Sequence, residues 1–119
     1  MPNSPHNVDL RIDASNQYSF SGGSEGNGNC FNAIGQGAAP VQITLEAPVG
    51  YRIRAMSDSP PGVGLAGNGA EKMKPSVAGN GRSANIANPC VDPADVEYTV
   101  NVETPDGGNI PCHPRIVNT

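Results

Sequence analysis

The chain has 119 residues, including 15 glycines and 12 prolines, with 36% hydrophobic residues and a net charge of −4. This length suits a single domain spanning residues 1–119, and the scattered basic residues argue against nucleic-acid binding. No apolar run approaches the ~18 residues that cross a membrane. The first six residues lack the basic and apolar regions of a secretion signal, which favours a cytoplasmic or virion location.

Alternating hydrophobicity predicts two short strands at the start of the chain. Residues 7–13 alternate between apolar and polar side chains with a period of two, which is typical of a strand with one solvated face. Residues 17–21 form a second run through Tyr18 and Phe20. The stretch 22–29 contains only Gly, Asn, Ser and Glu, so we expect a loop there, followed by a short apolar patch.

A hairpin is expected over residues 41–56. Residues 41–46 and 51–56 both alternate, and the Pro-Val-Gly between them suits a tight turn. In this hairpin Arg52 and Arg54 would lie across from Glu46 and its polar neighbours, with a modest cross-strand attraction.

The middle of the chain is weakly patterned. Residues 57–69 hold two adjacent prolines and four glycines and are expected to be irregular. Residues 71–74 can form one helical turn at most. Asn80-Gly81 is a strong signal for a type I′ turn, although its flanks are only weakly strand-like, and residues 84–87 predict a short strand.

The strongest strand signal lies at 96–103, where Val and Tyr alternate with Glu, Thr and Asn. The turn at 104–108 leads into a returning strand. The closing segment around Ile116 is expected to be an edge strand, because Pro111 and Pro114 cannot donate ladder hydrogen bonds.

These segments predict six to eight short strands. The fold class is therefore an all-β, single-domain antiparallel sandwich of immunoglobulin-like or jelly-roll type, with long Gly- and Pro-rich loops. Gly-Asn-Gly occurs at 26–28, 67–69 and 79–81. Three such loops gathered at one end would form an adhesive rim, but recurrence by composition is the simpler explanation, and whether they bind anything stays open.

Nucleophilic catalysis needs a nucleophile beside a base. The chain offers two imidazoles and three thiols: His6, His113, Cys30, Cys90 and Cys112. Cys112 and His113 are neighbours, and neighbours in a strand point to opposite faces, so they make a poor dyad. No catalytic residue is therefore assigned. The odd number of cysteines leaves open one disulfide with a free thiol or three free thiols.

Metal and sugar sites are also weakly indicated. The thiols and His113 lack chelating spacing, and the acidic cluster Asp92, Asp95 and Glu97 is more simply a turn than a calcium site. Asp58 and Asp92 cannot be placed relative to each other as a glycosidase pair. Most aromatic residues occupy expected inward positions, which leaves little platform for a sugar. No metal ligand, cofactor or cofactor-binding residue is assigned.

The C-terminal third has a distinctive order of residues. Val-Glu-Tyr-Thr-Val-Asn-Val-Glu at 96–103 precedes a turn with Asp-Gly, and His-Pro-Arg-Ile-Val-Asn follows at 113–118. This resembles small bacterial and phage sandwich proteins, including the DP-EP family, whose chains close with Asp-Pro-x-Ile-x-Asn. The segment 41–56, with its Ala-Pro-x-Gly-Tyr turn, also looks like theirs, whereas His113 stands where that motif has Asp. The resemblance implies an immunoglobulin-like sandwich without an assigned activity.

The expected function is contact, not catalysis. We expect a non-enzymatic structural, assembly or protein-interaction module, such as a self-assembling or virion-decoration protein. Its partner would be another protein or a second copy of the chain, and not nucleic acid or a membrane. Small residues, Pro-rich edges and the long loops 22–39 and 57–83 suit such contacts. The alternative is a module that binds a carbohydrate or a metal.

Overall fold

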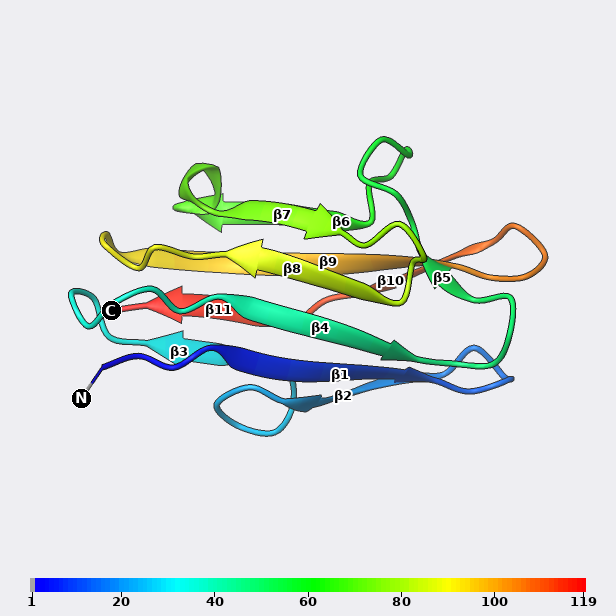
Figure 1. The fold of residues 1–119 in the computed structure, drawn as a ribbon, viewed down its shortest axis with the longest axis horizontal. Coiled ribbons are helices and arrows are strands. Elements are labelled where there is room, and N and C mark those ends of the chain that lie inside the picture. The colour runs from blue at the N-terminus through cyan, green and yellow to red at the C-terminus, as the bar shows by residue number, and fades with distance from the viewer. Residues whose placement is uncertain (1) are drawn as a thin grey trace.

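The computed structural model describes residues 2–119 and shows two β-sheets packed face to face, so the predicted all-β sandwich is confirmed (Figure 1). Sheet A contains, in spatial order, β2 (Tyr18–Gly22), β1 (His6–Ile12), β4 (Val41–Glu46), β8 (Ser83–Ala87) and β7 (Lys74–Val77). Sheet B is built around the long β9 (Ala94–Glu103). One side of β9 carries β5 (Arg52–Ile53) and β6 (Val63–Asn68); the other carries β10 (Asn109–Cys112) and β11 (Arg115–Asn118), with β3 (Cys30–Asn32) beyond.

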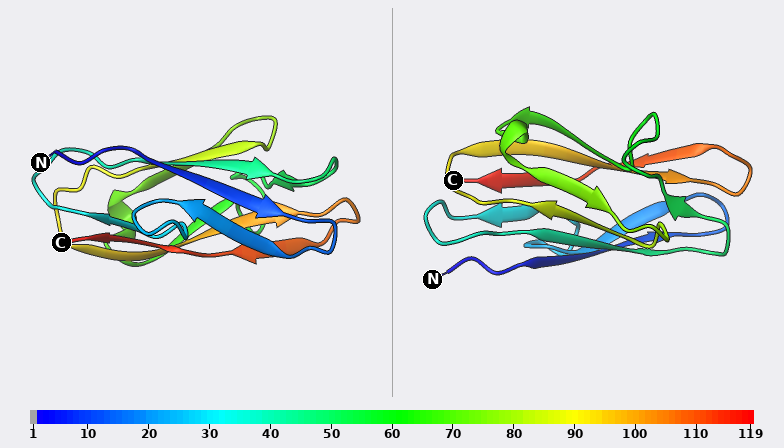
Figure 2. Two further views of the ribbon diagram at one scale, coloured as in Figure 1. Left: turned by 90° about the horizontal axis from the view of Figure 1, so that it is seen from below. Right: turned by 45° about the horizontal axis from the view of Figure 1, so that its top comes forward.

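The two layers are plain in Figure 2, in which both ends of the chain lie toward the same end of the sandwich. The only helical element in residues 2–119 is a 3-10 turn, η1 (Ala70–Lys72), which joins β6 in sheet B to β7 in sheet A. It lies one residue before the predicted helical turn. No helix in this part of the chain is long and apolar enough to span a bilayer.

Two of the strand pairings are parallel, which differs from the antiparallel arrangement that the sequence predicts. β1 pairs in parallel with β4, and β3 pairs in parallel with β11. The reason is the route of the chain: after the β1–β2 hairpin it crosses to sheet B to form β3, then returns to sheet A. Parallel neighbours require such a crossover connection.

The predicted hairpin over 41–56 is wrong. β4 lies between β1 and β8 in sheet A, whereas β5 lies beside β9 in sheet B, so the turn after β4 carries the chain between sheets. Arg52 is therefore opposite Glu103 and not Glu46. The Glu103 carboxylate lies 3.2 Å from Arg52 Nε and 3.0 Å from Arg54 Nη1. Alternation identified the inward faces of both runs but could not identify their partners.

The sequence does not predict β3, β6 and β7, and it places β11 wrongly at an edge. β6 is rich in glycine yet pairs in register with β9 from Val63 to Asn68. Its pairing with the strongest strand overrides its low intrinsic propensity. β11 lies between β9 and β3, because the three-residue β3 covers the side that the sequence leaves open.

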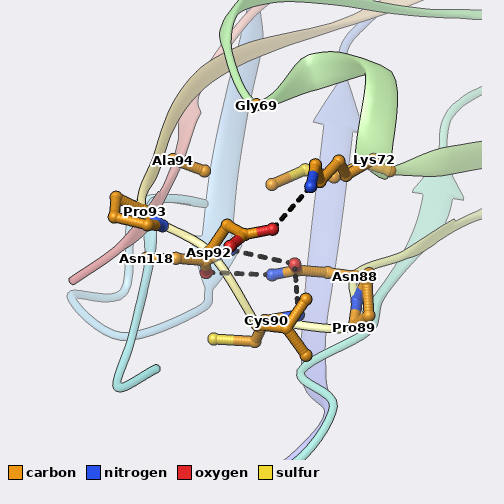
Figure 3. Close-up of a pocket in the computed structure, with 11 residues that line it drawn as sticks. Gly69, Lys72, Asn88, Pro89, Cys90, Asp92, Pro93, Ala94 and Asn118 are labelled. Atoms are coloured by element: carbon orange, nitrogen blue, oxygen red, sulfur yellow. Dashed lines mark hydrogen bonds and ion pairs between the residues drawn. The ribbon is translucent and has the colours of Figure 1, made fainter. Parts of the chain in front are cut away.

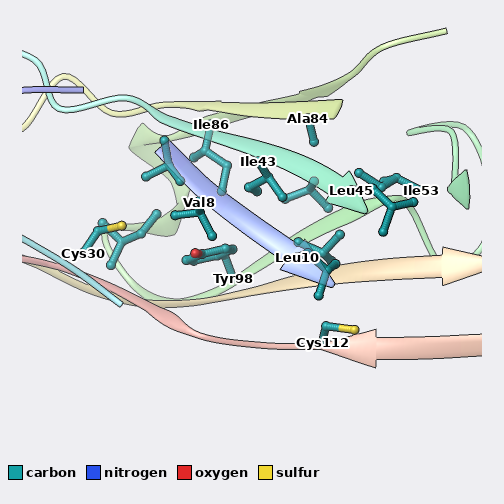
Figure 4. Packing of buried hydrophobic residues seen from close by; sticks show 14 of the residues in the cluster. Val8, Leu10, Cys30, Ile43, Leu45, Ile53, Ala84, Ile86, Tyr98 and Cys112 are labelled. Atoms are coloured by element: carbon teal, nitrogen blue, oxygen red, sulfur yellow. The ribbon is translucent and has the colours of Figure 1, made fainter. Parts of the chain in front are cut away.

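The core lies between the sheets, where Val8, Leu10, Ile43 and Ile86 of sheet A face Tyr98 of sheet B (Figure 4). Tyr98 is fully buried, and its hydroxyl donates to the Gly28 carbonyl at 2.5 Å. Cys30 and Cys112 also lie in this core. Small aliphatic side chains with one central ring thus fill the thin sandwich that the low aromatic content predicts.

Candidate interaction surface

The Cys112–His113 pair does not form a dyad. Cys112 is completely buried, whereas His113 is exposed on the outer face of sheet B, with Nδ1 3.8 Å from a carboxylate oxygen of Glu97. The two side chains therefore point to opposite faces, as predicted for neighbouring residues of extended backbone. Burial raises the pKa of both the Cys30 and the Cys112 thiols to about 12, so neither is a thiolate at neutral pH.

Cys90 and His6 belong to a polar network at the end of the sandwich where β11 ends and β1 begins. The side-chain amides of Asn88 and Asn118 bond each other reciprocally at 3.1 and 3.0 Å, and Asn32 Nδ2 donates to Asn118 Oδ1 at 3.1 Å. His6 Nε2 lies 2.7 Å from Asn32 Oδ1. The three cysteines are all free thiols.

A cavity adjoins this network and is lined by Asn88, Asn118 and Cys90, with the Lys72–Asp92 ion pair across it (Figure 3). Its volume is only about 10 Å³, which is at most the space of one water molecule. Cys90 has a positive φ of 55°, and its amide donates to Asn88 Oδ1. These contacts give the network a structural role in closing the end of the sandwich.

The acidic cluster does not converge on a metal site. Asp92 lies 2.6 Å from Lys72 Nζ, Asp95 lies 3.2 Å from Arg115 Nε, and Glu97 lies beside His113. Within residues 2–119, no three His, Cys, Asp or Glu side chains are close enough to hold a metal ion.

Asp58 and Asp92 do not form one site either. Asp58 lies beside Arg52, which is opposite Glu103 at the end of β9, whereas Asp92 precedes the start of the same strand. The length of β9 therefore separates the two carboxylates.

The three Gly-Asn-Gly loops do not gather into a rim. The loop 26–28 packs against Phe20, the loop 67–69 ends β6 beside Ala94, and the loop 79–81 turns β7 into β8 beside Ile53. The last two lie at opposite ends of β7 (Figure 1). Each contains at least one glycine with positive φ, so local backbone geometry accounts for the tripeptide.

The outer face of sheet B exposes an aromatic side chain. Phe31, 45% exposed, lies in a shallow depression of about 390 Å³ lined also by Asn29, Glu97, Arg115 and Val117. Tyr18 on β2 is the other exposed aromatic residue of the described chain. Apolar, amide and charged groups therefore meet at the Phe31 depression.

The edges of the sheets carry the free backbone N–H and C=O groups, and proteins usually block such edges against unwanted pairing. On β7 the Ala78 N–H bonds the Ser83 carbonyl, so the backbone of Pro75 points away from β8. Proline has no N–H to offer to another strand there. On β10 Pro111 faces away from β9 by the same rule. Both strands are thus blunted by proline.

Two further edges are capped by hydrogen bonds. The outward N–H of Ile53 on β5 donates to the Gly81 carbonyl at 2.8 Å. On β3 the Ser24 hydroxyl accepts from the Phe31 N–H at 2.8 Å and lies 3.4 Å from the Phe31 carbonyl, to which it donates. A single side chain therefore occupies both outward groups of β3.

β2 is partly covered by the loop that follows it. The Asp13 N–H bonds the Gln17 carbonyl, so the backbone N–H and C=O groups of Tyr18 and Phe20 point away from β1. The Gly22 carbonyl, which also faces outward, accepts from the Gly28 N–H at 3.0 Å. A Cβ at Gly28 would approach Phe20 Cβ to 2.9 Å, so this loop packs tightly against the end of the β2 edge.

β6 has no such protection. The Asn101 N–H bonds the Gly62 carbonyl, and this bond fixes which backbone groups point toward β9. The N–H and C=O groups of Gly64 and Ala66 point toward β9, whereas those of Leu65 and Gly67 point away from it. In the part of the chain that the structure describes, no group bonds the outward N–H and C=O of Leu65 and Gly67. The strand contains neither proline nor charge. We call Leu65–Gly67 the open edge.

One sequence feature indicates the open edge, namely a lack of charged residues, although the glycines of the same segment make it look like a loop. No charged residue occurs between Asp58 and Glu71, although this segment contains a strand at the margin of the molecule. The glycines make the segment resemble a loop, whereas the lack of charge is a feature of the open edge.

Comparison with known proteins identifies no family: no protein-family model matches the chain, and no curated protein matches it. The resemblance of the C-terminal third to the DP-EP family stays a prediction.

Proposed function

We propose that the protein is a non-enzymatic structural or protein-interaction module, which associates with copies of itself or with another protein. The open edge of β6 carries this proposal. The sandwich protects β3, β5, β7 and β10 by different means and covers one end of β2, whereas Leu65–Gly67 has none of these protections. An exposed, uncharged edge is a template for strand addition, which is a common way for one protein to bind another.

The placement of the reactive groups supports a function without catalysis. The Cys30 and Cys112 thiols are buried and protonated, and the exposed His113 lies beside Glu97 and not beside a nucleophile. A role in assembly, including decoration of a larger particle, requires only contact surfaces.

Sedimentation velocity from about 1 µM to about 500 µM tests self-association. We expect the weight-average sedimentation coefficient to rise with concentration toward the value of a larger species. A concentration-independent monomer over the whole range would contradict assembly from copies of this chain.

A second function, carbohydrate binding, is favoured by the Phe31 depression. An exposed ring beside the amide of Asn29 and the charges of Glu97 and Arg115 can stack on a sugar while polar groups bond its hydroxyls. A glycan array tests it: Phe31→Ala should abolish any signal, whereas Tyr18→Ala, which removes the other exposed ring, should retain it. Equal loss in both variants would contradict a site at Phe31.

A further inference from the structure

We infer that the occupant of the open edge is a second copy of this chain, joined through β6 by antiparallel pairing about a twofold axis at Ala66. This inference rests on the proposed function and specifies its partner. It would join sheet B of one copy to sheet B of the other through β6 of each.

The free backbone groups determine where the axis lies. Val63 also faces outward, but it is buried, so its backbone is not accessible. Leu65 is half-buried and Gly67 is exposed. With the axis at Ala66, Leu65 of one copy exchanges N–H and C=O bonds with Gly67 of the second copy, and Gly67 does the same with Leu65. Every accessible outward group of the open edge then has a partner.

The side chains of β6 can lie opposite the side chains of β6 in a second copy without a clash. Ala66 lies exposed on the outer face and would be directly opposite Ala66 of the second copy, with Cα atoms about 4.5 Å apart. On the inner face Leu65 would lie beside Gly67 of the second copy, which has no Cβ to crowd it. A methyl opposite a methyl and a large residue opposite glycine allow the backbones to approach.

The charge distribution also favours pairing between identical strands. In a twofold pair any charge on the edge would lie near its own like charge, and β6 carries none. The acidic residues of β9 opposite β6, Asp95 and Glu97, lie beside Arg115 and His113 on the far side from β6. Identical edges can therefore meet without bringing like charges of β6 itself together, even though each copy has a net charge of −4.

Introducing a charge at Ala66 tests the inference. In Ala66→Lys the new ammonium lies opposite Glu97 in the same copy, which favours folding, but directly opposite its own like charge in the pair. We expect its dimer dissociation constant, from sedimentation equilibrium, to rise about tenfold or more. The matched control is Ser76→Lys, which adds the same charge at an exposed position of the proline-blocked β7, and which should dimerise like the wild type.

An equimolar mixture of Ala66→Lys and Ala66→Glu should restore dimerisation, because opposite charges then face each other across the axis. Hydrogen exchange on the wild type gives an independent measurement: the Leu65 and Gly67 amides should become more protected as concentration rises, while the Gly64 and Ala66 amides change little. This readout needs no variant, so it remains decisive if a variant fails to fold by circular dichroism.

The outcomes separate the two proposals. If the wild type self-associates but Ala66→Lys behaves like Ser76→Lys, or if the protection appears at Tyr18 and Phe20 instead, the β6 pairing is overturned and self-assembly stands. If the wild type stays monomeric to about 500 µM, both self-assembly and the twofold pairing are overturned.

Discussion

Three weak acids are buried as neutral groups in the core of this sandwich, and they make its stability sensitive to alkaline pH. Burial raises the pKa of Cys30 and Cys112 to about 12, against 9.0 for an unperturbed thiol, and raises the pKa of the Tyr98 hydroxyl from 10.0. The desolvated thiolate or phenolate is the unfavourable form. The unfolded chain therefore releases these protons at lower pH than the folded one.

We predict that the free energy of unfolding is constant with respect to these groups below pH 9 and falls as pH rises from 9 toward 12. Above pH 9 the unfolded thiols ionise while the folded thiols do not, so each lowers stability by up to about 1.4 kcal/mol per pH unit. Urea unfolding at about pH 8, 9 and 10 measures the slope. Cys112→Ala should be less stable at neutral pH but show a shallower slope; an unchanged slope would contradict the buried-thiol origin.

At the scale of single strands, the Ser24 cap on β3 has a measurable consequence. Ser24→Ala removes the bonds to the Phe31 N–H and C=O, so we predict a loss of about 1 kcal/mol and faster hydrogen exchange at the Phe31 amide. Urea unfolding and exchange mass spectrometry measure the two effects. Ser21→Ala, at an exposed position on β2, is the control and should stay within about 0.5 kcal/mol of the wild type.

The cap also predicts a change in association. With Ser24 replaced, the outward groups of β3 become a second open edge, so Ser24→Ala should associate more strongly than the wild type in sedimentation velocity. Weaker or equal association would indicate that the Ser24 hydroxyl does not protect this edge.

A strand was predictable where its own residues alternate regularly, and not where it depends on pairing with a distant strand. β1, β4 and β9 were predictable, because regular alternation buries one face of each. β6 was not, because its glycines lack strand propensity and its pairing with β9 is a long-range contact. The predicted hairpin 41–56 failed for the same reason, since alternation is identical whether β5 pairs with β4 or with β9.

The candidate surface was predictable only in part. That Cys112 and His113 face opposite ways follows from strand geometry, and the structure confirms it. The open edge was not foreseen, because it depends on which residue of each edge strand points outward, and that register is set by partners elsewhere in the chain. The edge position of Pro111 is predictable, since its missing N–H has the same meaning in any register, and the structure confirms it.

At the scale of the whole molecule, the two sheets are tied at one end by amides. Asn118 ends β11 in sheet B, and Asn88 follows β8 in sheet A, so their reciprocal bonds cross between the layers (Figure 3). Both are buried, and Asn32 joins them from β3. Removing one amide leaves the Nδ2 group of the other without its acceptor in a buried site, which costs more than the bond itself contributes.

We therefore predict that Asn88→Ala and Asn118→Ala each lower the free energy of unfolding by about 2 to 3 kcal/mol, whereas the double variant loses less than the sum. The Nδ2 groups of the two amides bond each other, so the double variant orphans fewer groups than the two single variants together, and the coupling should be about 1 to 2 kcal/mol. Urea unfolding of the double-mutant cycle measures it. Asn85→Ala, at an exposed position on β8, should change stability by less than about 0.5 kcal/mol. Additive losses would show that Asn88 and Asn118 act independently, in which case the end of the sandwich is closed by apolar packing and not by the amides.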